Sequence, residues 1–204
     1  MENLNEMTAE RSLEIIKKYI EQSRKDTTKN AGMPMVIWGC LCMVTALIVG
    51  HLWNTSGNAA WNFLWFAMAL IGWGITIWMG RKEKAERQPQ TFVGKVMGHI
   101  WLSFGIFASV LPILMYVVMP LCGMPYFGIS YTPLVILLVG LCATATGLIL
   151  RNGWIVAGGI ISGLPGAILS SWLHGPAEML VMAGVALVAL IIPGILINWR
   201  KDYV

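Results

Sequence analysis

Six long apolar runs dominate this sequence and decide what it can fold into. Each has roughly the 20 residues that a helix needs to cross the hydrocarbon core of a bilayer. Only 12% of the residues are charged, whereas a soluble domain carries about a quarter. The chain cannot cover a water-facing surface with so few polar groups, so we predict an all-α, polytopic membrane protein. The predicted transmembrane helices are residues 34–53, 59–79, 93–119, 131–150, 153–173 and 178–197.

The basic residues predict the orientation of these helices. All fourteen Lys and Arg residues fall on one side of the predicted topology, in residues 11–29, residues 81–95, Arg151, Arg200 and Lys201. The loops on the opposite side contain none; they are residues 54–58, 120–130 and 174–177. Because Lys and Arg near the ends of spans stay in the cytoplasm, both termini are expected there. The net charge of +4 then reflects this rule and anionic lipid, and nucleic acid is not an expected partner.

Residues 8–26, which read TAERSLEIIKKYIEQSRKD, form the only substantial polar segment. At about 100° per residue, Leu13, Ile16 and Ile20 fall on one face of a helix and the charged residues fill the opposite face. The apolar face has to be buried against lipid headgroups, the protein's own inner face or a partner, which includes a second copy. Surface helices on membranes usually carry an excess of Lys and Arg. Acidic residues are mixed in here, so protein and lipid are equally expected partners for this docking face.

A break is expected between this helix and the first span. The sequence Asn-Ala-Gly-Met-Pro at residues 30–34 combines glycine and proline, which interrupt helices. We therefore predict two parts, an amphipathic helix with a linker at residues 1–33 and a six-helix transmembrane domain at residues 34–204.

The stretch SWLHGPAEM at residues 171–179 places His174 and Glu178 between two apolar runs. Both residues suit helix ends, because Glu178 would meet the positive end of the last span and His174 the negative end of the span before it. Together with His51, which ends the first span on the same side, they are also a candidate outer-face polar site for a divalent metal or a proton. The capping interpretation is preferred, and no metal is predicted.

Glycine and proline interrupt several spans near their middles. Gly163, Pro165 and Gly166 lie in residues 153–173, and Pro193 lies in the last span. Such breaks mark ligand sites in many transporters, so these four residues are a candidate midplane site. They are also common in membrane helices that bind nothing. Gly159 forms a GxxxG pair with Gly163 that permits close approach of another helix, and the glycine-lined faces make a homodimer reasonable.

Enzyme and cofactor signatures are missing from the sequence. It contains no phosphate-binding glycine loop, HExxH motif or GxSxG motif. The four cysteines have neither metal-ligand nor disulfide spacing. No acidic or basic residue lies at the centre of a span, which disfavours an ion-driven transporter. We predict no enzymatic activity and no cofactor.

The segment from Glu10 to Ile20, followed by Trp38 and Gly39 at the start of the first span, resembles a group of small bacterial inner-membrane proteins. The resemblance implies an amphipathic leader, several spans and a place in the bacterial inner membrane, and it implies no site. In size and span count the chain also looks like the substrate-binding components of vitamin transporters.

Two functions follow from these patterns. The preferred one is a non-enzymatic membrane component that senses, scaffolds or regulates, docking through Leu13, Ile16 and Ile20 on lipid, on a cytoplasmic protein or on a second copy. The alternative is a small-molecule transporter, or its substrate-binding component, with a site at the midplane breaks.

Overall fold

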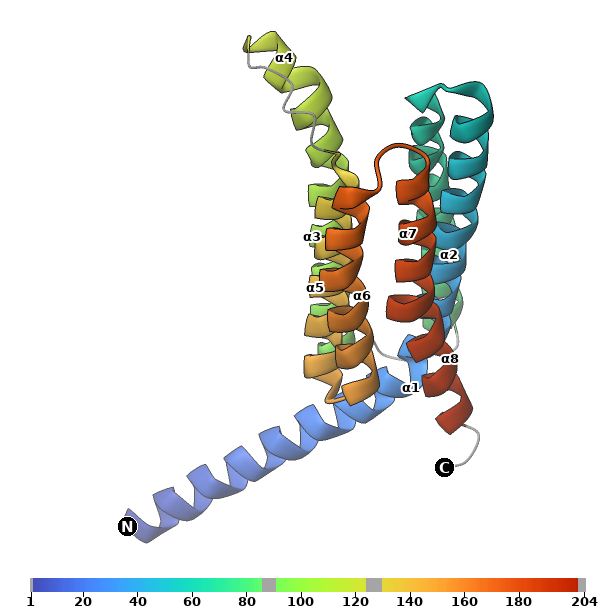
Figure 1. The fold of residues 1–204 in the computed structure, drawn as a ribbon. Helices are drawn as coiled ribbons and strands as arrows, with labels where there is room; N and C mark the ends of the chain where they lie inside the picture. The colour runs from blue at the N-terminus through green and yellow to red at the C-terminus, as the bar shows by residue number, and fades with distance from the viewer. Residues whose placement is uncertain (1, 86–90, 124–129, 202–204) are drawn as a thin grey trace.

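The computed structural model describes residues 2–85, 91–123 and 130–201, and in these residues the chain is helical and forms no strand (Figure 1). Arg87 and residues 124–129 of the outer loop lie outside the described residues. The elements are α1 Glu2–Ser56, η1 Ala59–Phe63, α2 Leu64–Ala85, α3 Phe92–Ile113, η2 Leu114–Val118, α4 Met119–Leu121, α5 Thr132–Leu150, α6 Gly153–Trp172, α7 Ala177–Ala186, η3 Leu187–Ile191 and α8 Ile192–Lys201.

Six helical stretches in this part of the chain are long and apolar enough to cross a membrane. The predicted all-α architecture with six spans is thereby confirmed. The observed stretches are Ala31–Ser56, Ala59–Lys82, Phe92–Leu121, Thr132–Leu150, Gly153–Trp172 and Ala177–Trp199.

The first span continues an unbroken helix. The sequence predicts a break at residues 30–34, but α1 carries Pro34 inside it and runs from Glu2 to Ser56. Proline is tolerated in a membrane helix where neighbouring groups enclose the freed backbone, and Gly32 is buried there against Asn198 of α8. Figure 1 shows α1 changing direction at the base of the bundle, as helices do at proline. We call residues 10–28, which project beneath the bundle, the arm.

Glycines bring the closest helices together. Glycine has no Cβ atom, and adding one shows how close the neighbouring helix lies. A Cβ atom added to Gly140 of α5 would lie 2.6 Å from the Cα atom of Gly163. One added to Gly159 would lie 2.6 Å from the backbone nitrogen of Thr144. Gly159 and Gly163 thus permit close approach, as predicted, and the helix that approaches is α5 of the same chain. Because this face is already occupied, it gives no support to the homodimer expected from it.

The first span packs in the same manner against the last one. A Cβ atom on Gly39 would lie 2.9 Å from the Cβ atom of Leu190, and one on Gly50 would lie 2.9 Å from the Cβ atom of Met179. These two glycines set α1 against η3 near the middle of the span and against α7 at its outer end. The α1 helix therefore lies at the centre of a tightly packed group of helices that consists of α1 and α5 to α8, which we call the packed half of the bundle.

Two wide turns accommodate prolines. The π-helical segments η2 and η3 each end two residues before a proline, Pro120 and Pro193 respectively. In η3 the amide of Ile192 donates to the carbonyl of Leu187, five residues earlier. The wider turn lets the chain pass a residue that has no amide proton. The last span is therefore continuous as a helix, although its hydrogen-bond pattern changes before Pro193.

Candidate functional site

The predicted docking face lies on the part of the arm that projects from the bundle. Leu13, Ile16 and Ile20 are 67%, 54% and 46% exposed. None of these side chains is buried on the protein's own inner face. Of the three environments that the sequence allows, the structure leaves lipid or a partner.

The same helical face continues into the bundle. Ser23 and Thr27 follow Ile20 at spacings of three and four residues, so they share its face, and both are buried. The amide of Val93 donates to Ser23 Oγ at 3.1 Å, and the hydroxyls of Thr27 and Thr91 are hydrogen-bonded to each other. The arm therefore supplies a hydrogen-bond acceptor to the first turn of α3, whose amide protons have no partner in their own helix.

Sequence reasoning missed this contact. Thr91 is the N-cap of α3, and its hydroxyl accepts from the amide of Gly94 at 3.1 Å. The signal available in the sequence was that Ser23 and Thr27 occupy the positions at which the apolar row of Leu13, Ile16 and Ile20 would continue. We call this row, from Leu13 to Thr27, the stripe. Small hydroxyl residues at such positions suit contact with a helix N-terminus better than contact with lipid.

The outer polar residues assemble around Glu178, which is 2% exposed. Its Oε1 accepts from the amide of Gly175 at 3.2 Å, and its Oε2 accepts from the hydroxyl of Ser130. Glu178 thus lies in the first turn of α7, as the sequence predicts, and its carboxylate bonds to Gly175 in the turn that precedes this helix. It also holds the segment that leads into α5, which the sequence does not predict.

Tyr131 connects this cluster to the other outer ends. Its hydroxyl donates to Asn62 Oδ1 at 3.3 Å, and its ring meets that of Tyr116 edge to face with centroids 5.9 Å apart. Burial, and then the negative charge of Glu178, raise the pKa of the Tyr131 phenol to about 12. The phenol is therefore a hydrogen-bond donor throughout the physiological range.

The two histidines of the candidate outer site are not drawn into this cluster. His51 and His174 are exposed, and the ring of His174 contacts the carbonyl of Trp172 at 3.2 Å. In the residues that the structure describes, no three side chains of His, Cys, Asp or Glu form a group that could hold a metal ion. Of the three predicted residues, only Glu178 is buried, and its partners Ser130 and Gly175 are half-buried.

The residues of the candidate midplane site have packing contacts. Gly163 meets Gly140, and a Cβ atom on Gly166 would lie 2.7 Å from Val185 Cγ2. Pro165 is exposed within an α6 helix that continues through it. Pro193 is buried, and its ring would lie 3.2 Å from a Cβ atom added to Gly158 of α6. Gly158 lies one helical turn before Ser162. Helix packing accounts for Gly163, Gly166 and Pro193, whereas Pro165 lies at the surface of the bundle.

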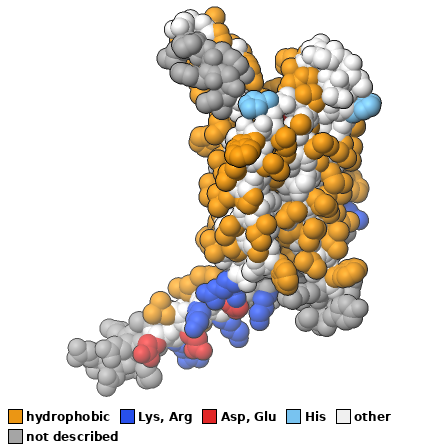
Figure 2. Space-filling view, in the orientation of Figure 1, with side chains coloured by type: hydrophobic (Ala, Val, Ile, Leu, Met, Phe, Trp, Pro, Cys, Tyr) orange, Lys and Arg blue, Asp and Glu red, His pale blue; other side chains and the backbone are white. Residues whose placement is uncertain are grey.

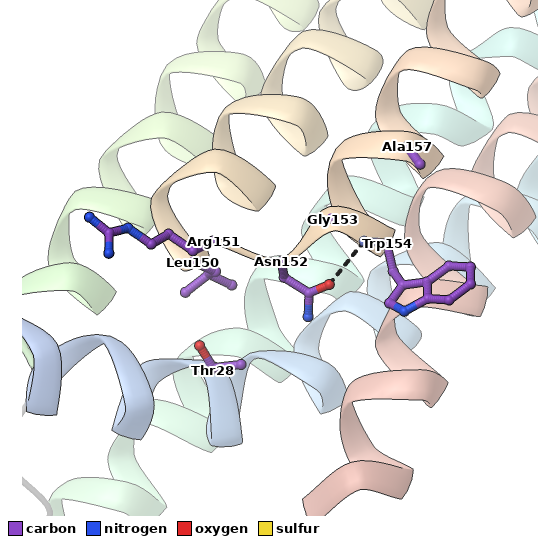
Figure 3. A pocket seen from close by; sticks show the side chains of 7 residues that line it. All are labelled: Thr28, Leu150, Arg151, Asn152, Gly153, Trp154 and Ala157. Atoms are coloured by element: carbon purple, nitrogen blue, oxygen red, sulfur yellow. Dashed lines mark hydrogen bonds between the residues drawn. The ribbon is translucent and has the colours of Figure 1, made fainter.

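A cavity of about 530 Å³ lies at the inner end of the bundle, between the arm and the turn that joins α5 to α6 (Figure 3). Figure 3 shows Arg151 and Trp154 extending to opposite sides, with Asn152 between them and Thr28 of the arm below. The cavity is lined by Thr28, Leu150, Arg151, Asn152, Gly153, Trp154 and Ala157.

Hydrogen bonds fix the geometry of this turn. Asn152 Oδ1 accepts from the amide of Trp154 at 3.1 Å and so caps α6. Arg151 ends α5 in the left-handed conformation with φ of 50°. Among the described residues, no carboxylate lies within ion-pair distance of its guanidinium. The turn therefore presents a cationic group that has no acidic partner in the part of the chain that the structure describes.

Comparison with known proteins gives no further assignment, because no family model, no curated protein and no solved structure matches the chain.

Proposed function

We propose that this chain is a non-enzymatic membrane component with a sensing, scaffolding or regulatory role, and that it docks through the arm. The distribution of its basic residues supports a bacterial inner-membrane protein with both termini in the cytoplasm. In that orientation the arm lies at the cytoplasmic surface, where it is available to a partner.

The continuous stripe on α1 is the observation that carries this proposal. Its inner part, Ser23 and Thr27, is buried on α3, whereas its outer part, Leu13 to Ile20, is exposed. Burying one large aliphatic side chain stabilises an assembly by roughly 1.5–3 kcal/mol. An exposed row of such side chains on a helix anchored at one end is therefore suited to hold a partner.

Cysteine labelling in native membranes tests whether the stripe is docked. Single cysteines replace Leu13, Ile16 or Ile20 on the stripe, and Glu14 or Lys18 on the polar face, after the four native cysteines have been changed to alanine. Inside-out vesicles are treated with a membrane-impermeant maleimide. We expect the stripe positions to react about tenfold more slowly than the polar positions, which corresponds to about 1.4 kcal/mol of protection.

A charge-matched pair of variants provides the control. Ile16→Asp combined with Ile20→Asp should raise the labelling of a cysteine at position 13 to the rate of the polar face. Lys17→Gln combined with Lys18→Gln changes the net charge by the same amount and should leave that rate unchanged. Equal labelling of both faces in native membranes would contradict the proposal.

A further inference from the structure

The stripe on the arm faces toward the bundle. Leu13, Ile16, Ile20, Ser23 and Thr27 succeed one another at spacings of three and four residues, so they lie along one face of the helix. Ser23 and Thr27 contact the start of α3. The exposed part of the stripe must then point to the same side, toward the layer that contains the spans.

Figure 2 shows this arrangement directly. Along the projecting arm, hydrophobic side chains gather on the side of the bundle, and most charged side chains lie on the opposite side. Around a membrane-spanning bundle, the space on the bundle side of the arm is filled by lipid. This geometry favours a lipid surface over a cytoplasmic protein, which would approach from the other side.

The level of the arm agrees with the headgroup layer. The arm bonds to the first turn of α3, where Phe92 is 56% exposed, and it lies beside Trp154, which is 59% exposed. Exposed aromatic residues at the ends of spans mark the boundary between hydrocarbon and headgroups. The stripe therefore lies at the depth at which an interfacial helix buries its apolar face.

The cavity beside the arm has the chemistry to receive a lipid headgroup. Arg151 has no acidic partner among the described residues, and exposed Lys25 lies one turn before Thr28 on the arm. A guanidinium binds a phosphate with two parallel hydrogen bonds. Trp154 and Ala157 supply apolar surface on the side from which acyl chains would enter.

We propose that the stripe of the arm lies in the headgroup layer at the inner end of the bundle, and that the cavity beside Arg151 holds the phosphate of an anionic phospholipid. This inference rests on the proposed docking function and names its partner as the membrane surface. The exposed stripe and the cavity then form one continuous lipid-binding surface. The charged face of the arm, with Lys17 and Lys18, remains in water.

Reconstitution of the full chain distinguishes whether lipid, a protein partner or a second copy covers the stripe. The purified protein is placed in vesicles of phosphatidylethanolamine with phosphatidylglycerol, diluted so that most vesicles hold a single chain. Spin labels at positions 13, 16 and 20 should show high collision rates with oxygen and low rates with a water-soluble nickel complex. Labels at positions 14 and 18 should show the reverse.

Three results would overturn the inference. Stripe labels that are open to the nickel complex in pure vesicles, but protected in native membranes, would identify a protein partner and leave the docking function intact. Protection that arises only when vesicles hold several chains would identify a second copy. Stripe positions exposed in both settings would remove the inference and the docking function together.

Native mass spectrometry tests the cavity. Arg151→Gln should lower the retention of phosphatidylglycerol relative to phosphatidylcholine by about tenfold, which corresponds to about 1.4 kcal/mol. Lys95→Gln removes a charge from the inner end of α3, outside the cavity lining, and should leave retention unchanged. Loss of retention on addition of inorganic phosphate alone would assign the site to a free anion. Equal effects of the two variants would remove the site.

Discussion

The last span and the third span are both strongly apolar, with mean hydropathies of 2.8 and 2.2, but they have very different surroundings. In the most apolar window of Ala177–Trp199, 61% of residues are buried, whereas in that of Phe92–Leu121 none is. The second span, Ala59–Lys82, is close to the third, with 6% buried. The apolar character of a helix therefore predicts that it enters the membrane, but it does not predict whether the helix faces protein or lipid.

Close backbone approach distinguishes the two classes of span. Glycines in α1, α5 and α6 lie against backbone or Cβ atoms of neighbouring helices. By contrast, a Cβ atom added to Gly74 of α2, or to Gly98 or Gly105 of α3, would meet nothing within 4 Å. Lipid tails are as apolar as leucine, so helices associate in a bilayer through tight packing and hydrogen bonds. The packed half of the bundle has these contacts, and α2 and α3 have few.

The few contacts of α2 and α3 can be named. The ring of Trp38 of α1 fills the space over Gly72, and its indole nitrogen donates to Thr76 Oγ1 at 3.1 Å. The α3 helix is held at its inner end by Ser23. At the outer ends, Tyr131, which precedes α5, bonds to Asn62 of η1, before α2. These contacts add to the packing of the inner half of α3, where Val93 and Met97 are buried.

The largest effect is expected where α5 meets α6. Gly163→Leu forces a side chain toward the Cα atom of Gly140 and should cost about 3 kcal/mol, the upper end of the usual range for overpacking. Gly105→Leu places the same side chain in open space on α3 and should leave stability unchanged or raise it. Unfolding by SDS in mixed micelles measures both. Equal losses would show that the packed and open halves do not differ as described.

The architecture could be predicted from the sequence because hydropathy and length determine it almost alone. The path of α1 could not. Residues 30–34 carry a glycine and a proline, which predict a break in water-soluble proteins, yet the contact of Gly32 with α8 encloses the backbone at this point. A local sequence pattern does not indicate whether a neighbouring helix will enclose the backbone at that point.

The candidate sites could also be predicted only in part. Glu178 could be recognised as a cap from its position after Gly175 and Pro176. Its bond with Ser130 joins residues 48 positions apart, and no spacing rule reaches that far. Ser23 illustrates the same limit, because its partner Val93 is 70 residues away. Local capping was predictable, and the partners across helices were not.

A smaller effect is expected at the inner attachment of α3. Ser23→Ala leaves the amide of Val93 without its acceptor and should cost about 1 kcal/mol, as the loss of a helix cap does. Hydrogen exchange in the first turn of α3 should accelerate while exchange in α5 and α6 stays the same. Ser103→Ala, within α3, serves as the control, because among the described residues the Ser103 hydroxyl bonds only to the carbonyl of His99. Acceleration spread evenly over all spans would contradict a local attachment.

The smallest effect is expected from the charge of Glu178 on the ionisation of Tyr131, because burial is the larger cause of the raised pKa. Burial and the charge of Glu178 raise its pKa from 10.0 to about 12, so between these pH values the folded chain keeps a proton that the unfolded chain has lost. The stability that this proton contributes is present below pH 10 and is lost as the pH rises toward 12. Glu178→Gln removes the charge but not the burial, so the pKa of Tyr131 should fall only part of the way back. Absorbance of the phenolate, taken as the difference from Tyr131→Phe, measures this shift. A pKa unchanged by Glu178→Gln would mean that the carboxylate does not act on the phenol, and burial alone would then account for the raised pKa.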